Sequence, residues 1–211
     1  EQEKEDETGS DIDEVVEDVE ESSNVILSGN CGENGDNVTF VLDSDGLLTI
    51  SGSGRMENYQ NDMSLPPWSP VNTTDISMSF IKSIMINEGV TSIGNFAFYA
   101  NISLISVTIP DGVTSIGEYS FRTCSSLTSV RIPDGATIIK KGAFQSCVGL
   151  TDIVIPNDIV TIEENAFEFC DSLQDVYYDG SEDEWKCISV GAGNAAIDNA
   201  VIHYNSAPAL V

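Results

Sequence analysis

The sequence predicts an α/β-type repeat solenoid, in which short strands and a helical turn recur in every coil. Four sets of apolar residues return every 23 residues, and the 211-residue chain, with 41% hydrophobic content, is long and apolar enough for an array with a cap at each end. A unit of this size can bury its apolar side chains only against copies of itself, so stacked coils are favoured over one closed core. The recurring sets are Ile84, Val107, Val130 and Ile153; Ile86, Ile109, Ile132 and Ile155; Ile93, Ile116, Ile139 and Ile162; and Phe98, Phe121, Phe144 and Phe167.

Residues 1–22 are predicted to form an acidic, flexible spacer. Residues 1–21 contain twelve acidic side chains and one Lys, a composition typical of a solvated tail. An amphipathic helix over 12–19 is the alternative, because its apolar residues have helical spacing and Ser10 could cap it. So short a helix is marginal in water, and its like charges repel each other, so the spacer is favoured.

Residues 23–80 are predicted to form an N-terminal β-hairpin cap and a connecting loop. Apolar residues alternate over 38–42 and again over 48–50, and turn residues at 43–46 separate the two runs. Gly-rich and Pro-rich segments then interrupt regular structure before the repeats begin. We expect Trp68, in the second of these segments, to pack onto the first coil rather than to bind a ligand.

Residues 81–172 are predicted to form four repeats, and the copy at 104–126 illustrates the reasoning. Around Val107, inward apolar residues alternate with polar ones, as in a strand. Pro110 ends this strand because it has no N–H for the ladder, and the following Asp-Gly turns the chain. Phe121 then falls at the spacing of a helical turn and should fill the interior.

Residues 173–211 are predicted to form a fifth, partial coil and a C-terminal cap. The strand positions recur once more, at Leu173, Val176 and Tyr178. Residues 182–185 then predict a helical turn, and 200–204 predict a closing strand. A cap is required because the last coil would otherwise expose its apolar end and its strand edges, and Trp185 is expected to cover that end.

The three most regular repeat units keep an Ile-Pro at the end of a strand and a Phe three residues before a Cys, and the full pattern adds an Ile-Gly step and an Ala before the Phe. Three units read LISVTIPDGVTSIGEYSFRTCSS, LTSVRIPDGATIIKKGAFQSCVG and LTDIVIPNDIVTIEENAFEFCDS. They resemble the BspA-type leucine-rich repeats of bacterial surface proteins. With flanking segments that are also similar to those of such arrays, the resemblance covers residues 24–205. The first unit departs from the pattern at Asn87 and Asn101, the third at Lys140 and the fourth at Glu163.

The resemblance implies a secreted or cell-surface protein, a module for adhesion or for binding an extracellular host or matrix protein or a glycan. It implies no catalytic activity and no cofactor, although a shared fold by itself names no ligand. Two alternatives stay open: the attachment or substrate-binding part of a cell-wall-acting enzyme, and a non-catalytic spacer. The sequence does not indicate the oligomeric state.

The charge balance argues against some partners. Eight Lys and Arg residues against 35 Asp and Glu residues give a net charge of -27. Nucleic acids and anionic lipid surfaces are bound through clusters of Lys and Arg, so neither is an expected partner. No apolar run approaches the ~20 residues that span a bilayer, so we expect no membrane insertion.

Catalytic and metal sites are not indicated by the cysteine and histidine residues. Cys124, Cys147 and Cys170 are one period apart, which predicts an interior ladder of small apolar side chains. No spacing typical of zinc ligands occurs, so no metal site is assigned. His203, the one histidine, and Cys187 have no evident third group to orient them as a base and a nucleophile.

A row of acidic turn residues has two interpretations. The same turn position is occupied by Glu88, Asp111, Asp134 and Asn157. Their oxygen atoms could bind Ca²⁺, but Asp and Asn are also the residues that such turns prefer. The turn interpretation is favoured.

The outward side of the first strands is the predicted ligand-binding surface. Strand residues alternate between two faces, and the inward set barely varies between repeats, whereas the outward set ranges from apolar to cationic to aromatic. Arg131 and Tyr177 are of types enriched at binding hot spots. The alternative is a solvated face that binds nothing. The predicted row is Met85, Thr108, Arg131, Val154 and Tyr177, beside Ser83, Ser106, Ser129, Asp152 and Asp175.

Overall fold

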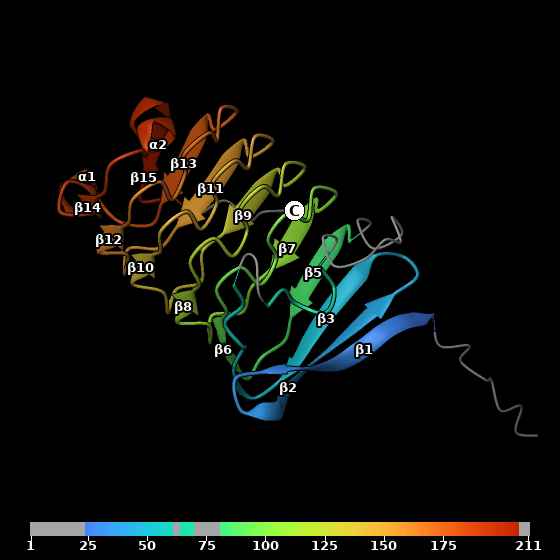
Figure 1. Ribbon diagram of the computed structural model, residues 1–211. Helices are drawn as coiled ribbons and strands as arrows, with labels where there is room; N and C mark the ends of the chain where they lie inside the picture. Colours follow the sequence, from blue (N-terminus) through green and yellow to red (C-terminus); the bar gives the residue numbers. More distant parts are fainter. Residues whose placement is uncertain (1–23, 61–63, 70–80, 207–211) are drawn as a thin grey trace, which may run out of the picture.

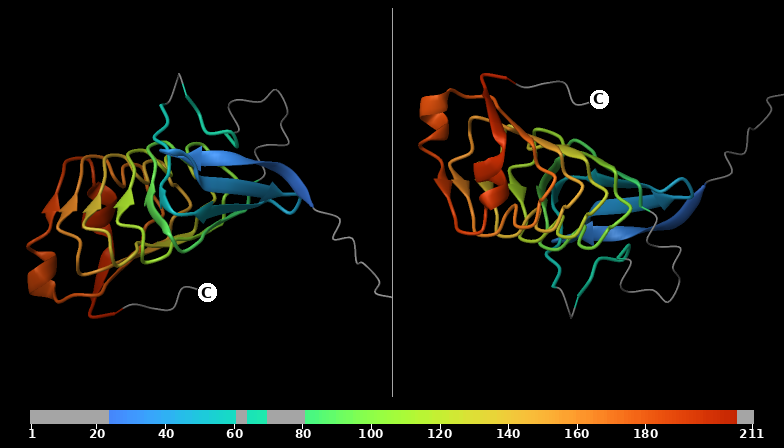
Figure 2. Two further views of the ribbon diagram at one scale, coloured as in Figure 1. Left: turned by 90° about the horizontal axis from the view of Figure 1, so that it is seen from below. Right: turned by 90° about the horizontal axis from the view of Figure 1, so that it is seen from above.

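The computed structural model describes residues 24–60, 64–69 and 81–206, where nearly every regular element is a strand (Figure 1). The predicted spacer at 1–22 and part of the predicted connecting loop lie outside these ranges. The described chain winds into stacked coils, and the predicted repeat solenoid is confirmed (Figure 2).

The first strand of each coil lies beside a first strand of a neighbouring coil in parallel register. Ser83 lies opposite Ser106, and Asp152 lies opposite Asp175, so equivalent repeat positions are side by side. Because side chains alternate along a strand, this register directs the apolar positions of every coil to one interior. These strands are β5 (Ser83–Ile86), β7 (Ser106–Thr108), β9 (Ser129–Arg131), β11 (Asp152–Ile155) and β13 (Asp175–Tyr178).

A second strand in each coil joins a six-stranded parallel sheet on another side of the solenoid. Ile139 lies opposite Ile116 on one side and opposite Ile162 on the other, so this sheet also keeps the repeat register. Its strands are β4 (Gly54–Arg55), β6 (Val90–Ile93), β8 (Ser115–Ile116), β10 (Ile138–Ile139), β12 (Thr161–Ile162) and β14 (Ser189–Val190).

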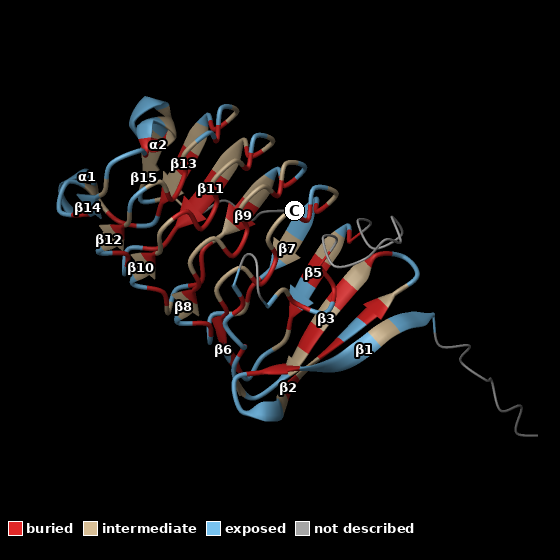
Figure 3. Ribbon diagram, in the orientation of Figure 1, coloured by how far each residue is buried: buried red, intermediate tan, exposed pale blue. Residues whose placement is uncertain are grey.

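Three antiparallel strands extend the first-strand sheet at its N-terminal end. They are β1 (Val25–Gly32), β2 (Gly35–Asp43) and β3 (Leu47–Gly52), and β2 and β3 form the predicted hairpin. The Asp43 carboxylate closes its turn by accepting the backbone N–H groups of Asp45 and Leu47 at 2.9 and 3.0 Å. Strand β3 then pairs in parallel with β5. Buried residues lie along both strands of the hairpin (Figure 3). The sequence pattern does not predict β1, because most of its side chains are exposed and its apolar residues do not alternate.

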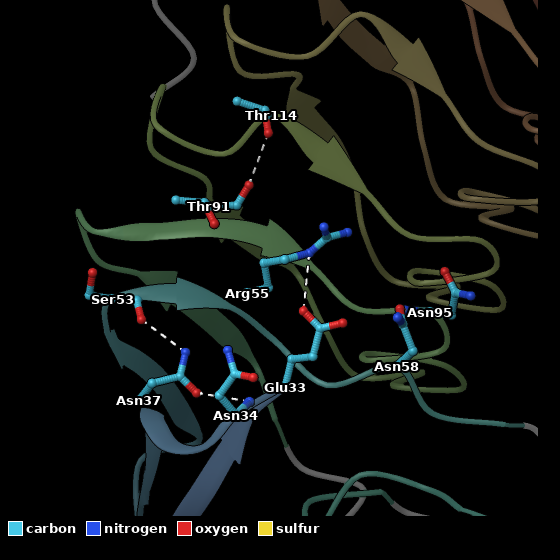
Figure 4. Close-up of polar contacts among 9 residues, drawn as sticks. All are labelled: Glu33, Asn34, Asn37, Ser53, Arg55, Asn58, Thr91, Asn95 and Thr114. Carbon is cyan, nitrogen blue, oxygen red and sulfur yellow. Dashed lines mark hydrogen bonds and ion pairs between the residues drawn. The ribbon is translucent and has the colours of Figure 1, made fainter.

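Side-chain amides form hydrogen bonds with backbone groups of the hairpin and the first coil (Figure 4). The Asn37 amide donates to the carbonyl oxygen of Ser53 at 2.9 Å and accepts the backbone N–H of Asn34 at 3.2 Å. Asn58 Oδ1 accepts the backbone N–H of Asn95 at 2.9 Å. These residues therefore provide partners for main-chain groups that no strand ladder reaches.

The helical turn predicted in each repeat is not formed. After the second strand, the chain makes a run of consecutive turns, called here the turn run, over residues 95–100 and their equivalents. Its alternate N–H groups donate to the next coil, from Phe96, Phe98 and Ala100 at 2.9, 2.8 and 2.9 Å. Phe96 and Ala100 have φ of 54° and 61°, outside the helical region, and the alternate N–H groups of the run point toward the next coil. An α-helix would direct these groups along its own axis, so bonding between coils replaces the helical pattern.

The core is a column of stacked rings with a column of thiols beside it. Phe98, Phe121, Phe144 and Phe167 are fully buried, and successive ring centroids lie 5.1, 5.4 and 5.5 Å apart. Burial of each such side chain contributes roughly 1.5–3 kcal/mol. Cys124, Cys147 and Cys170 are also buried with free thiols, as the sequence predicts.

Trp68 joins the hairpin to the first coil, which confirms the predicted packing role. Its side chain is fully buried, and its Nε1–H donates to the carbonyl oxygen of Ala97 at 2.8 Å. Its ring makes an edge contact with Phe40, at 4.8 Å between centroids, and stacks on Phe98 at 6.0 Å.

The fifth coil has both of its strands, although the sequence predicts only a partial one. Helix α1 (Glu182–Trp185) is inserted between β13 and β14, and Ser181 and Glu184 form a capping box at its start. Helix α2 (Ala195–Asn199) then takes the place of the turn run, and β15 (Val201–Tyr204) pairs with β13. The predicted helical turn and closing strand are thus both present, and Trp185 packs edge-on against Tyr178.

Candidate ligand-binding face

Strand pairing brings much of the predicted row together. Met85 lies opposite Thr108, and Val154 lies between Arg131 and Tyr177. Strands β7 and β9 belong to two different sheets, so the face has an interruption between Thr108 and Arg131. We call the outward side of these strands the first-strand face.

Four residues of the row are accessible and one is not. Met85 is 43% exposed, Thr108 is exposed, and Arg131 and Tyr177 are half-buried. Val154 is fully buried, so its predicted place in a ligand-binding surface is wrong. Strands of a sheet lie about 4.8 Å apart, so this short side chain sits between two long ones, and we attribute its loss of exposure to them.

The Arg131 guanidinium already has an intramolecular partner. Its Nη2 forms an ion pair with Asp134 Oδ1 at 2.6 Å, and the two side chains are 38% and 52% exposed. Exposed pairs of this kind stabilise a fold by at most about 1 kcal/mol. A ligand carboxylate could therefore compete with Asp134 at small cost.

His203 extends the row by one strand, and the sequence analysis missed it. It lies opposite Tyr177 on β15, and the two rings stack at 4.7 Å with 16° between their planes. Its Nε2 lies 2.7 Å from Asp175 Oδ1. Since α1 lengthens this coil, His203 follows Tyr177 by 26 residues and falls outside the 23-residue period. A search that allowed an insertion at 182–185 could have found it.

The row also continues toward the hairpin. Thr49 on β3 lies opposite Met85, and Val41 on β2 lies opposite Thr49. Val41 is exposed, so it and Met85 place apolar surface at this end of the face. The sequence analysis places the hairpin before the coils but not in the same sheet, and so it omits these two residues.

The neighbouring row is polar, and its acidic members gather at the C-terminal end. Asp152 and Asp175 lie opposite each other, and Asp152 accepts the Thr151 hydroxyl at 2.8 Å. Val201, 59% exposed, lies opposite Asp175 on β15. The first-strand face is thus apolar at one end and acidic and aromatic at the other.

The acidic turn row engages in contacts of its own. Asp111 Oδ1 accepts the backbone N–H of Asp134 at 3.4 Å, and Asp134 pairs with Arg131. In the described ranges, no three His, Cys, Asp or Glu side chains are arranged to share a metal ion. These contacts favour the turn interpretation.

Cys187 and His203 lie on different parts of the last coil. Cys187 precedes β14, and its thiol donates to the carbonyl oxygen of Asp183 at 3.3 Å, whereas His203 lies on β15 with Asp175.

Among the described helices, none is long and apolar enough to cross a membrane.

Comparison with known proteins agrees with this architecture. The chain is similar in structure to a leucine rich cell surface protein from Faecalibacterium prausnitzii A2-165, with 28% identity, a TM-score of 0.57, and coverage of 73% of this chain and 41% of that one. It also resembles leucine-rich repeat proteins from Eubacterium ventriosum ATCC 27560 (23% identity, TM-score 0.53, coverage 75% and 45%) and Bacteroides ovatus ATCC 8483 (20%, 0.51, 75% and 42%). The chain spans less than half the length of these proteins.

A family pattern covers more than half of the chain. None of the curated proteins compared with the chain matches it. Residues 76–186 match the family described as BspA type Leucine rich repeat region (6 copies). The repeats of residues 81–172 lie within this match. The chain therefore belongs to the BspA-type leucine-rich-repeat family.

Proposed function

We propose that the protein is a recognition module of the bacterial cell surface that binds an extracellular protein or glycan through its first-strand face. The observation that carries the proposal is the contrast between the two sides of the same strands. The inward positions are almost all Ile and Val, whereas the outward row differs from strand to strand and is held in register by strand pairing on each side of the interruption between β7 and β9. Repeat proteins commonly use such extended faces for binding.

The proposed contact residues follow from exposure and residue type. Arg and Tyr are enriched among residues that dominate binding energy, and Arg131 and Tyr177 lie two strands apart on this face. Both are half-buried and held by neighbours, Arg131 by Asp134 and Tyr177 by His203. Side chains that are already positioned lose less conformational entropy on binding. Val154 is not among the proposed contacts.

The proposed location rests on a relative. The Faecalibacterium prausnitzii protein is described as a cell surface protein, and it shares the fold at 28% identity. A surface position would expose the first-strand face to extracellular proteins and glycans. The net charge of -27 favours cationic partners over nucleic acid.

The experiment begins with capture of a ligand from extracellular-matrix and cell-surface extracts on the immobilised full chain. The ligand is then identified, and its Kd is measured for the unaltered protein and for Arg131→Ala with Tyr177→Ala. We expect the double variant to lose affinity at least about 30-fold, the effect of removing a hot spot worth 2 kcal/mol.

The matched control is Thr137→Ala with Val160→Ala, two exposed residues beside the second strands. This variant should retain full affinity, and thermal melts should show that both variants remain folded. Equal affinity of the Arg131 and Tyr177 variant and the unaltered protein would place the site elsewhere. Failure to capture any ligand would favour a non-catalytic spacer.

A further inference from the structure

The bonding between turn runs changes at the end of the array. In the first three coils, the last of the N–H groups that point toward the next coil donates to a carbonyl oxygen there. The donors are Ala100, Thr123 and Ser146, at 2.9, 2.8 and 2.7 Å. Phe169 is the equivalent residue of the fourth coil. Within the described ranges, its N–H has no acceptor.

The interruption follows from the replacement of the fifth turn run by α2. The turn run of the fourth coil keeps its first two hydrogen bonds to the fifth coil. Asn165 N–H donates to the Ala192 carbonyl oxygen and Phe167 N–H donates to Asn194 Oδ1, each at 2.9 Å. Beyond Asn194 the chain enters the helix and leaves the path of the earlier coils. A pocket of about 390 Å³ lies between α2 and the fourth turn run.

The pocket has an apolar lining and acidic groups. Phe169, Leu173 and Cys170 line the side of the fourth coil, and Ala195 and Ala196 line the side of α2. Small alanines keep the helix side open, and Leu173 and Cys170 are buried. The polar lining residues are Glu168, Asp171 and Asn199.

Phe169 is unusual for its position. The equivalent residues of the earlier coils, Ala100, Thr123 and Ser146, are small, and all four positions have φ between 60° and 64°. The left-handed backbone recurs through the coils, at the bulky Phe96 and Tyr119 as well, so it is the size of the side chain at this position that sets Phe169 apart. The Phe169 side chain is nevertheless 57% exposed at the pocket rather than buried in the core.

We propose that this pocket binds an arginine side chain presented by a protein partner. A planar guanidinium can stack on the exposed ring of Phe169 while its apolar stem lies along Leu173 and Ala196. The Asp171 carboxylate can then accept its N–H groups in a charge-assisted hydrogen bond. The lining contains two carboxylates and no cation, so a basic side chain also complements its charge.

This site is separate from the first-strand face, so it does not depend on the proposed function. Its volume lies in the range of pockets that take small ligands, about 300–1,000 Å³. Glu168 is already bonded to the Gln145 amide, so Asp171 is the carboxylate with capacity to spare.

The test is an NMR titration of the full ¹⁵N-labelled chain with the peptide Ac-Gly-Arg-Gly-NH₂. We expect saturable shifts at the amides of Phe169, Asp171 and Ala196, with a Kd of about 1 mM, as suits a fragment of this size. The counterpart peptide, in which citrulline replaces arginine, keeps the shape and loses the charge. It should bind at least about tenfold more weakly.

Three variants locate the site. Asp171→Asn should weaken binding of the arginine peptide about tenfold. Ala196→Leu, which fills the pocket, should abolish saturable shifts. Asp198→Asn removes the same charge from α2 outside the pocket and should leave the Kd unchanged. The proposal is overturned if the citrulline peptide binds equally well, if the two Asp variants behave alike, or if no saturable shift appears. The peptide comparison needs no variant, so it decides the question even where a substitution impairs folding.

Discussion

The thiol of Cys147 donates a hydrogen bond to the carbonyl oxygen of Phe121, one coil earlier, at 3.1 Å. The same oxygen accepts the backbone N–H of Cys124 at 3.2 Å, so both of its lone pairs have a partner. Cys170 and Phe144 repeat the arrangement at 3.1 Å. The thiol thus supplies the second partner of a buried carbonyl oxygen, so a small apolar side chain with a weak donor suits this position.

We predict that thiol reagents will separate the cysteines into two classes. Burial raises the pKa of the Cys147 thiol well above its ordinary value and that of Cys170 to about 12, so both remain neutral and inaccessible in the folded protein. Cys187 is exposed and serves as an internal positive control. Mass spectrometry after brief labelling at pH 8 should find Cys187 modified and the ladder modified only in denaturant. Rapid native labelling of Cys147 would refute its placement.

Replacement of Phe144 by Ala should destabilise the whole array. The Phe144 ring lies between Phe121 and Phe167, parallel to them within 9°, so its removal leaves a cavity with stacked neighbours on both sides. The expected cost is ~3–5 kcal/mol, and coupling between coils spreads the effect. Denaturant unfolding measures it, with Val148→Ala, at an exposed position, as the control that should change stability by less than about 0.5 kcal/mol. A cost near 1 kcal/mol for Phe144→Ala would contradict the tightly packed column.

Asn101→Cys should stabilise the protein by about 1 kcal/mol. Asn101 occupies the ladder position of the first coil and is buried; its Nδ2 donates to the Phe98 carbonyl oxygen at 2.9 Å, but in the described structure its Oδ1 has no partner. Cysteine removes this buried acceptor and keeps a donor. A calorimetric melt should show a higher melting temperature, and a lower one would mean that the amide hydrogen bond outweighs the unpaired oxygen.

Gly142→Ala should be costly, and part of the cost should vanish when Tyr119 is removed. Gly142 has φ of 60°, and a Cβ there would meet the ring of Tyr119. The left-handed backbone alone costs an Ala residue about 1–2 kcal/mol. A double-mutant cycle with Tyr119→Ala isolates the contact, and we expect a coupling of at least about 1 kcal/mol from urea unfolding. Additive free energies would show that the ring moves aside freely.

The position of the site was only partly predictable. Arg131 and Tyr177 could be assigned to one face because side chains alternate strictly along a strand, and the structure places both on it. Val154 shares that alternation but is buried, since exposure depends on the neighbours across the sheet. His203 could not be assigned from the period, because the insertion of α1 shifts it by three residues relative to the repeat.

The sequence by itself determined the solenoid and its interior, because apolar residues at 23-residue spacing can be buried together only in stacked coils in parallel register. The tertiary structure decided the conformation of the turn run. The spacing of Phe121 is compatible with a helical turn, but the N–H of Phe121 donates instead to Ala143 in the next coil. It also decided that a pocket lies beside Phe169, where α2 ends that bonding. A local pattern cannot specify these features, because the groups that accept the hydrogen bonds lie a full coil away in the chain.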